Sequence, residues 1–425
     1  MFMRSKTALR IYVSLFLAGT AFGDFNWKET HDQGVRAFRD NQLEIAEPFL
    51  RRSFEQAHYA DEIATSGNDL GVLLHYRCRD AEAKPVLTLA LAEWQRLGRK
   101  DAAARSSHAL GAVLRSLGEY AETERILRLA IETQPTLPND FALLTNAMAD
   151  LLREEGRLTE AANYAHMTLQ TPGLAWRTSI DATITLADVH REARLFTLSQ
   201  EGWTKAISES RLHNDSVIEA VALRGLAETQ LMIGDRASAE PTLRKALAYF
   251  ESTGNKHQIA STLTCLADLY LAENKPALSE QALRRAVELD ETVLGPMHPQ
   301  IAVMLQARAS AAAHLGAMAR ARADLDRAGE ILKARFGNTA PVLGAFFANR
   351  GMIEERGGNP ADAAANYAKA SGILRAAGDD ALHLRTIVME HYAGVLRTLH
   401  KRDQAKAALA ESKSFKAIEA KGFRP

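Results

Sequence analysis

Small, turn-forming and large apolar residues recur in a fixed order along most of this chain. In the clearest copy, the small residue Gly111 is followed by Gly118, and Leu127 and Ala130 come after it. Apolar positions that recur at intervals of three and four residues lie on one face of an α-helix. A glycine between two such stretches ends the first helix and closes a turn. The pattern therefore predicts a hairpin of two antiparallel helices.

The small residue of the first helix can be followed through ten copies of this pattern. Successive copies lie 37 to 42 residues apart, and periods of this size are typical of helical repeat arrays. We therefore expect an all-α fold, an α-solenoid of about ten antiparallel helical hairpins. The ten small residues are Gly34, Gly71, Gly111, Ala149, Ala187, Ala227, Ala267, Ala309, Gly351 and Ala393.

Helix packing explains the residue types at these positions. Two helix axes approach closely only where the side chains between them are small. We expect the small residue of the first helix to face the alanine of the second helix, with leucines such as Leu87 and Leu127 filling the space toward the next hairpin. We also expect five turn glycines to end first helices in the left-handed conformation, namely Gly118, Gly156, Gly234, Gly316 and Gly358.

This order of residues resembles the tetratricopeptide repeat, and the resemblance covers about residues 27–415. It implies a right-handed superhelix of hairpins. The wider spacing of the later copies and the segment 294–299 resemble the kinesin-light-chain subtype. HEAT or Sel1-like repeats fit the pattern less well. Cys78 and Arg194 stand where two copies should have a turn glycine, and the first copy lacks that glycine.

The two ends of the chain differ from the array. Arg4, Lys6 and Arg10 precede an apolar run over residues 11–22, and small residues stand just before Asp24. This is the layout of a cleavable secretory signal peptide over residues 1–23, and the run is short for a membrane-spanning helix. We expect export to the periplasm or the outside of the cell, with no integral membrane span after cleavage. The array then occupies residues 24–415, a last helix near residues 404–420 caps it, and residues 416–425 form a tail.

Composition and charge exclude several classes of protein. Basic and acidic residues balance at 52 each, without a basic stripe, so no nucleic-acid partner is expected. The two cysteines, Cys78 and Cys265, exclude a disulfide-rich scaffold. They lie five copies apart, so we expect two free thiols.

The motifs of common catalytic and metal sites are absent from the sequence. It has no phosphate-binding loop, no nucleophile elbow and no paired histidines with zinc-ligand spacing. The thirteen histidines are scattered over the copies. We therefore expect neither an enzyme nor a cofactor or metal site.

The resemblance implies that the first helices line a concave groove. Reading the groove-facing offsets along the register gives the candidate binding residues Asn68, His75, His108, Arg115, Asn146, Asp150, Arg153, Asp188, Arg191, Arg224, Glu228 and Asp268. The family's carboxylate clamp is not reproduced among them. Farther along, Leu271, Ala313 and Met352 give the groove a more apolar character.

Arg115, Arg153 and Arg191 occupy the same offset in three consecutive copies. Such a ladder of guanidinium groups suits the carboxylates of a peptide. Asp150 and Asp188 stand three residues before two of these arginines, so ion pairs within a helix are the alternative interpretation. Arg115 has no such aspartate and is expected to be the freest.

These features together predict an exported, non-enzymatic scaffold that binds partner proteins or extended peptides in its concave groove. A peptide-sensing regulatory protein, whose superhelix changes shape on ligand binding, is the alternative. Self-association into a homo-oligomer is compatible with both interpretations.

Overall fold

A computed structural model describes residues 26–40, 42–77, 79–338, 340–376 and 382–419. These residues form twenty α-helices and no strand. The predicted signal peptide and Cys78 lie outside the described residues. No described helix is both long and apolar enough to cross a membrane.

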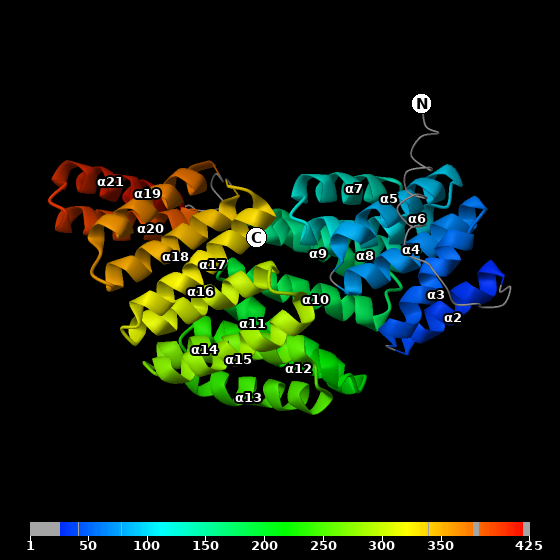
Figure 1. Cartoon of the computed structure of the whole chain (residues 1–425), viewed down its shortest axis with the longest axis horizontal. Helices are drawn as coiled ribbons and strands as arrows, with labels where there is room; N and C mark the ends of the chain where they lie inside the picture. Colours follow the sequence, from blue (N-terminus) through cyan, green and yellow to red (C-terminus); the bar gives the residue numbers. More distant parts are fainter. Residues whose placement is uncertain (1–25, 41, 78, 339, 377–381, 420–425) are drawn as a thin grey trace, which may run out of the picture.

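The helices pair into ten antiparallel hairpins, which we number in chain order (Figure 1). The first helices are α2 (Trp27–Arg39), α4 (Ala60–Tyr76), α6 (Lys100–Ser116), α8 (Pro138–Glu154), α10 (Trp176–Glu192), α12 (Ser216–Met232), α14 (Lys256–Ala272), α16 (Pro299–His314), α18 (Pro341–Arg356) and α20 (Leu382–Thr398). The second helices are α3 (Leu43–Gln56), α5 (Asp80–Arg96), α7 (Tyr120–Glu132), α9 (Leu158–Gln170), α11 (Phe196–Leu212), α13 (Arg236–Thr253), α15 (Pro276–Leu294), α17 (Met318–Phe336), α19 (Pro360–Ala376) and α21 (Arg402–Glu419). Each hairpin packs on the next. The prediction of an all-α solenoid of about ten hairpins is confirmed.

The small residue of the first helix makes room for a large residue of its own hairpin. A Cβ atom added at Gly34 would lie 2.8 Å from Cγ of Leu50, and one at Gly351 would lie 2.7 Å from the ring of Tyr367. Leu50 is fully buried and Tyr367 nearly so. The expectation that this residue faces the alanine of the second helix is therefore wrong for these hairpins. At Gly34 the second helix itself comes close, since the added Cβ atom would also lie 3.1 Å from the backbone nitrogen of Leu50. The glycine thus leaves room both for the neighbouring helix and for its large side chain.

The turns follow the sequence pattern. All five glycines that were expected to end first helices adopt positive φ angles, from 72° to 84°. Arg194 holds the same conformation, at φ 62°, in a hairpin whose turn lacks glycine. The prediction for these turns is confirmed.

The buried core runs along the array between adjacent helices rather than filling one centre. Its largest continuous part extends from Ile180 to Ile353 and includes the fully buried Trp203 and Phe250. Cys265 is a free, buried thiol within this part. At the C-terminal end, Phe415 on α21 packs against α20, and α21 continues to Glu419.

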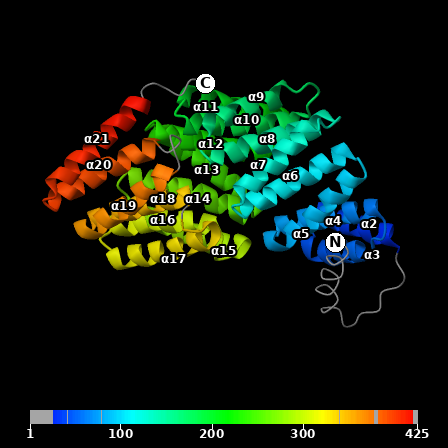
Figure 2. The same ribbon diagram turned by 90° about the horizontal axis from the view of Figure 1, so that it is seen from above.

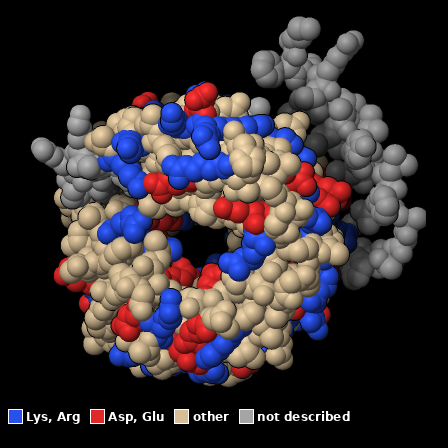
Figure 3. All heavy atoms as spheres, turned by 90° about the vertical axis from the view of Figure 1, so that its left-hand side faces the viewer, with Lys and Arg blue, Asp and Glu red and all other residues tan. Residues whose placement is uncertain are grey.

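The stacked hairpins curl into a superhelix. Figure 1 shows the chain bending from α2 through α12 and back to α21. Seen along its longest direction, the molecule surrounds an open central hollow lined with basic and acidic side chains (Figure 3). We call this hollow the channel.

Candidate functional site

The concave wall of the superhelix contains two hollows formed by first helices. The first has a volume of about 400 Å³ and lies between α6, α8 and α10. The second has a volume of about 470 Å³ and lies mainly between α10, α12 and α14. The first is lined by the predicted residues His108, Arg115, Asn146, Asp150 and Asp188. The second is lined by the predicted residues Arg191, Arg224, Glu228 and Asp268.

The remaining three candidates, Asn68, His75 and Arg153, do not line either hollow. The side-chain amide oxygen of Asn68 accepts a hydrogen bond from the Ser106 hydroxyl at 2.8 Å. The Nδ1 atom of His75 lies 2.6 Å from the Asp80 carboxylate. Structural partners thus hold Asn68 and His75 outside the hollows.

The arginine ladder is present, but carboxylates of the protein already contact it. Arg153 lies 2.6 Å from Glu192 on the next first helix and 3.9 Å from Asp150 on its own. Arg191 donates hydrogen bonds to Asp188 within its helix, with the shorter at 2.5 Å. Ion pairing within helices therefore accounts for part of the ladder, and pairing between hairpins accounts for the rest.

Arg115 is less free than its sequence context predicts. Its guanidinium group lies 3.8 Å from Asp150 and 3.6 Å from Glu154, both on the following first helix. The sequence shows that Arg115 has no aspartate three residues before it, but it does not show which residues of the next first helix lie close to Arg115. Both distances exceed that of a hydrogen bond, so Arg115 remains the least engaged guanidinium of the three.

The ladder continues into the second hollow through Glu228. Its carboxylate lies 3.3 Å from Arg191 and 3.0 Å from Arg224. It also accepts a hydrogen bond from the Cys265 thiol at 3.1 Å. A line of alternating charges thus runs over α6, α8, α10 and α12, and the Cys265 thiol connects its end to α14.

Burial shifts the pKa values of several carboxyl groups along this line. It raises the pKa of Asp150, Glu154 and Glu192, although neighbouring arginines oppose the shift. Burial acts in the same direction on Glu228, but Arg224 and Arg191 outweigh it, and the pKa of Glu228 is lowered. The charged groups of the wall are therefore only partly hydrated. Their electrostatic interaction with a charged ligand is stronger than it would be in bulk water.

Asp268 and His108 line the hollows and have no hydrogen-bond or ion-pair partner among the described residues. Solvent reaches Asp268 from the channel, but surrounding protein atoms and the negative charge of Glu228 raise its pKa to about 6. His108 lies at the first hollow, where burial and the charge of Arg115 lower its pKa to about 4. At neutral pH, Asp268 is thus mostly ionised and His108 is neutral.

The sequence register missed Glu154 and Glu192, which complete the ladder. Each directly follows a predicted arginine, one position beyond the offset used to select groove residues. Asp181 at the first hollow was missed as well. A search for acidic residues next to the ladder arginines would have found the two glutamates.

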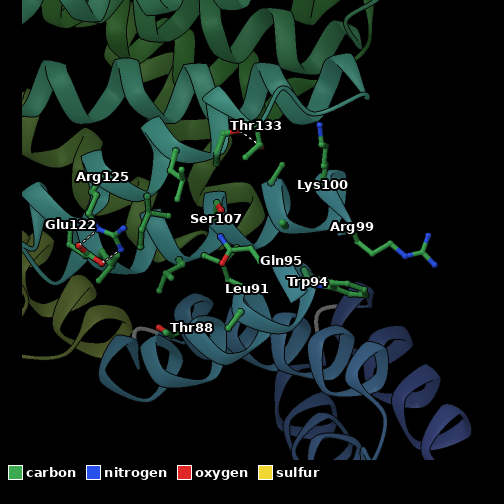
Figure 4. A pocket seen from close by; sticks show the side chains of 18 of the residues that line it. Thr88, Leu91, Trp94, Gln95, Arg99, Lys100, Ser107, Glu122, Arg125 and Thr133 are labelled. Atoms are coloured by element: carbon green, nitrogen blue, oxygen red, sulfur yellow. Dashed lines mark hydrogen bonds and ion pairs between the residues drawn. The ribbon is translucent and has the colours of Figure 1, made fainter. Parts of the chain in front are cut away.

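A third hollow, of about 780 Å³, lies on the outer side between α5, α6 and α7 (Figure 4). Its lining includes the apolar Leu91, Ile126 and Leu129. Glu122 and Arg125 pair with each other at one end of it, and Arg99 points away from it. None of the predicted site residues lines this hollow.

Throughout the part of the chain that the structure describes, no group of three or more histidine, cysteine, aspartate or glutamate side chains is arranged to hold a metal ion.

Comparison with known proteins supports the repeat assignment. A family model described as tetratricopeptide repeat matches residues 259–300, which cover most of α14 and all of α15. A search of curated proteins found no match.

Two solved structures are similar over much of the chain. A Rap protein complexed with competence and sporulation factor shares 13% identity with a TM-score of 0.58, and the match covers 85% of this chain and 99% of that one. The apo form of RapI shares 13% identity with a TM-score of 0.53, covering 62% and 97% of the two chains. These likenesses, together with the repeat match, show that the fold is a tetratricopeptide-like solenoid.

BtubC (BKLC) from P. vanneervenii shares 17% identity with a TM-score of 0.40, and the match covers 52% of this chain and 91% of that one. A TM-score this low does not bear on the repeat subtype. The kinesin-light-chain subtype of the C-terminal half therefore stays a prediction.

Proposed function

We propose that this protein is a non-enzymatic scaffold that binds a partner protein or an extended peptide along its concave face. The main support is the pair of hollows formed by consecutive first helices and lined by charged and polar side chains. Concave sites with a few converging polar groups are the usual form of a binding site. The similar Rap protein was solved in complex with a factor, which is compatible with this use of the fold.

The charges of the wall indicate which groups of such a ligand each part of the channel contacts. Arg115 makes only long ion pairs, so it can turn to a ligand carboxylate without losing a protein hydrogen bond. Arg153 and Arg191 hold their carboxylates in hydrogen bonds, and they serve mainly to fix the wall. Farther along, Leu271 and Met352 offer partly buried apolar surface. We propose that the N-terminal half of the channel contacts polar or acidic groups of the ligand and the C-terminal half contacts apolar ones.

Charge reversal tests this assignment. A partner is first isolated by affinity capture with the chain that starts at Asp24, and its binding is then measured with both proteins purified. Arg115→Glu combined with Arg153→Glu should weaken binding by about tenfold or more, because a like charge replaces the contact of Arg115 with the ligand and the change at Arg153 removes the partner of Glu192 that fixes the wall. Circular dichroism should show that the variant keeps its helices.

Arg125→Glu is the matched control, because Arg125 lies on α7 at the outer hollow and pairs with Glu122 there. It should leave the affinity unchanged. Equal affinity of the wild type and the double variant for the purified partner would show that the ladder does not contact the ligand.

We also propose that residues 1–23 are a cleavable export signal, on the basis of the basic start and the short apolar run. Amino-terminal sequencing of the protein from its native cell should begin at Asp24. A sequence that begins at Met1, in protein recovered from the cytoplasm, would exclude export.

A further inference from the structure

Successive turns of the superhelix contact each other between hairpins 3 and 8. The ring of Phe336, the last residue of α17, lies over Gly118 in the turn between α6 and α7. A Cβ atom at Gly118 would lie only 2.9 Å from Cδ1 of Phe336. The neighbouring Arg335 donates a hydrogen bond to the Ser116 hydroxyl at 3.3 Å and lies 3.9 Å from the Asp80 carboxylate. These residues are more than two hundred positions apart in the sequence, and Figure 2 shows the two parts of the chain next to each other.

Asp80 is the centre of this contact on the N-terminal side. Its side chain is 9% exposed, and it accepts hydrogen bonds from His75 and Ser116 as well as pairing with Arg335. A buried carboxylate with several partners has a fixed position. The N-terminal half therefore presents a rigid acceptor to the end of α17.

A second contact joins hairpins 5 and 10. Arg194, in the turn between α10 and α11, lies 3.0 Å from Nε2 of His383 on α20. The Phe336 ring over Gly118 and the contact at His383 each connect hairpins that are five apart in the array, and the Arg335–Asp80 pair connects hairpin 8 with hairpin 2. We call the two together the seam.

The seam bridges the side opening of the channel at two places. The concave groove of a superhelix opens sideways between successive turns, and a folded protein or an internal loop can enter through that opening. Here the turns touch at two places, and the wall surrounds the hollow when it is viewed along its axis (Figure 3). The groove is thus bridged along its side at two places, while the hollow is open along the axis (Figure 3).

We propose that the ligand of the channel is a single extended polypeptide segment with a free end, which enters along the axis. This inference rests on the proposed binding function and names the form of its ligand. A segment held between two folded domains, or a closed loop of a folded protein, enters only after the seam opens.

The test uses the full array with linear peptides selected against it from a random peptide library. Each selected peptide is compared in three forms, with both ends free, with a folded domain fused to one end, and with folded domains fused to both ends. Wild-type protein should bind the first two forms. It should bind the third at least about a hundredfold more slowly, since association that waits for a conformational change is slow.

Opening the seam should remove this difference. In the variant that combines Arg335→Glu with Arg194→Ala, Arg335→Glu places a second negative charge beside Asp80 and Arg194→Ala removes the side chain that contacts His383. The doubly fused peptide should then associate within about threefold of the rate for the free peptide. Small-angle scattering should show a larger radius of gyration for this variant than for the wild type.

The control combines Lys333→Glu with Arg284→Ala, at exposed residues on α17 and α15 that lie outside the seam. It carries the same change of charge and should behave as the wild type. Rapid binding of the doubly fused peptide by wild-type protein would overturn the inference while leaving the binding function intact. If the library yields no peptide that binds the channel, the proposed function fails with respect to peptides, whatever the state of the seam.

Discussion

Adding one methyl group at Gly71 should destabilise the array, because the second helix of the same hairpin occupies the space that it needs. A Cβ atom at this position would lie 2.8 Å from Cδ2 of Leu87 and closer still to its Cγ. Leu87 is fully buried and cannot swing into solvent. Forcing extra volume into a packed core costs about 1–3 kcal/mol. Alanine is better than glycine in a helix by about 1 kcal/mol, so Gly71→Ala should lose up to about 2 kcal/mol of unfolding free energy in total.

Two further glycines provide a graded comparison. Gly111 occupies the same register position, but its added Cβ would lie 3.2 Å from the nearest atom of Leu127. Gly111→Ala should therefore be close to neutral. Nothing lies within 4 Å of a Cβ at Gly394, inside α20, so Gly394→Ala should gain about 0.5–1 kcal/mol from helix propensity alone.

Urea unfolding followed by circular dichroism measures the series. Because repeat arrays can unfold in parts, amide hydrogen exchange in α4 and α5 should be recorded as well. The double variant Gly71→Ala with Leu87→Ala should be less destabilised than the sum of its single changes, since the clash disappears with the leucine. Equal stabilisation by Gly71→Ala and Gly394→Ala would refute the packing of Gly71 against Leu87.

Three other predictions concern titrating and reactive groups of the channel wall. Surrounding protein atoms and the charge of Glu228 raise the pKa of Asp268 to about 6 in the folded state, compared with its usual 3.8. The folded state therefore keeps a proton that the unfolded state releases between these two values, and stability falls as pH rises through this window. Asp268→Asn should therefore raise the urea midpoint more at about pH 7 than at about pH 4, and an equal change at both values would contradict the shift. Burial and Arg115 lower the pKa of His108 to about 4. Its contribution to stability is therefore present above about pH 6.5 and is lost as pH falls toward 4. The NMR signal of its imidazole, assigned with His108→Gln, should not move above about pH 5.5. Burial and Glu228 raise the pKa of the Cys265 thiol well above its usual 9.0. In a Cys78→Ser background, iodoacetamide should therefore modify Cys265 only after unfolding. Rapid labelling of the folded protein would show that the thiol is accessible.

The sequence by itself determined the hairpins and their register. Small residues, turn glycines and apolar positions such as Gly111, Gly118 and Leu127 act over one hairpin and its neighbour, so a single repeat contains the information for its own fold. Groove positions also recur with the helical period within each repeat. For this reason the sequence register correctly selected nine of its twelve candidate residues, which line the two hollows.

Only the tertiary structure decided which groups meet across helices. It showed that Gly34 and Gly351 face the large residue of their own hairpin, that Arg115 has partners on α8, and that Glu154 and Glu192 complete the ladder. It also brought Arg335 to Asp80 and Arg194 to His383. The pitch of the superhelix is the sum of small rotations between many hairpins. No single repeat encodes that sum, and therefore no local pattern in the sequence could predict where one turn touches the next.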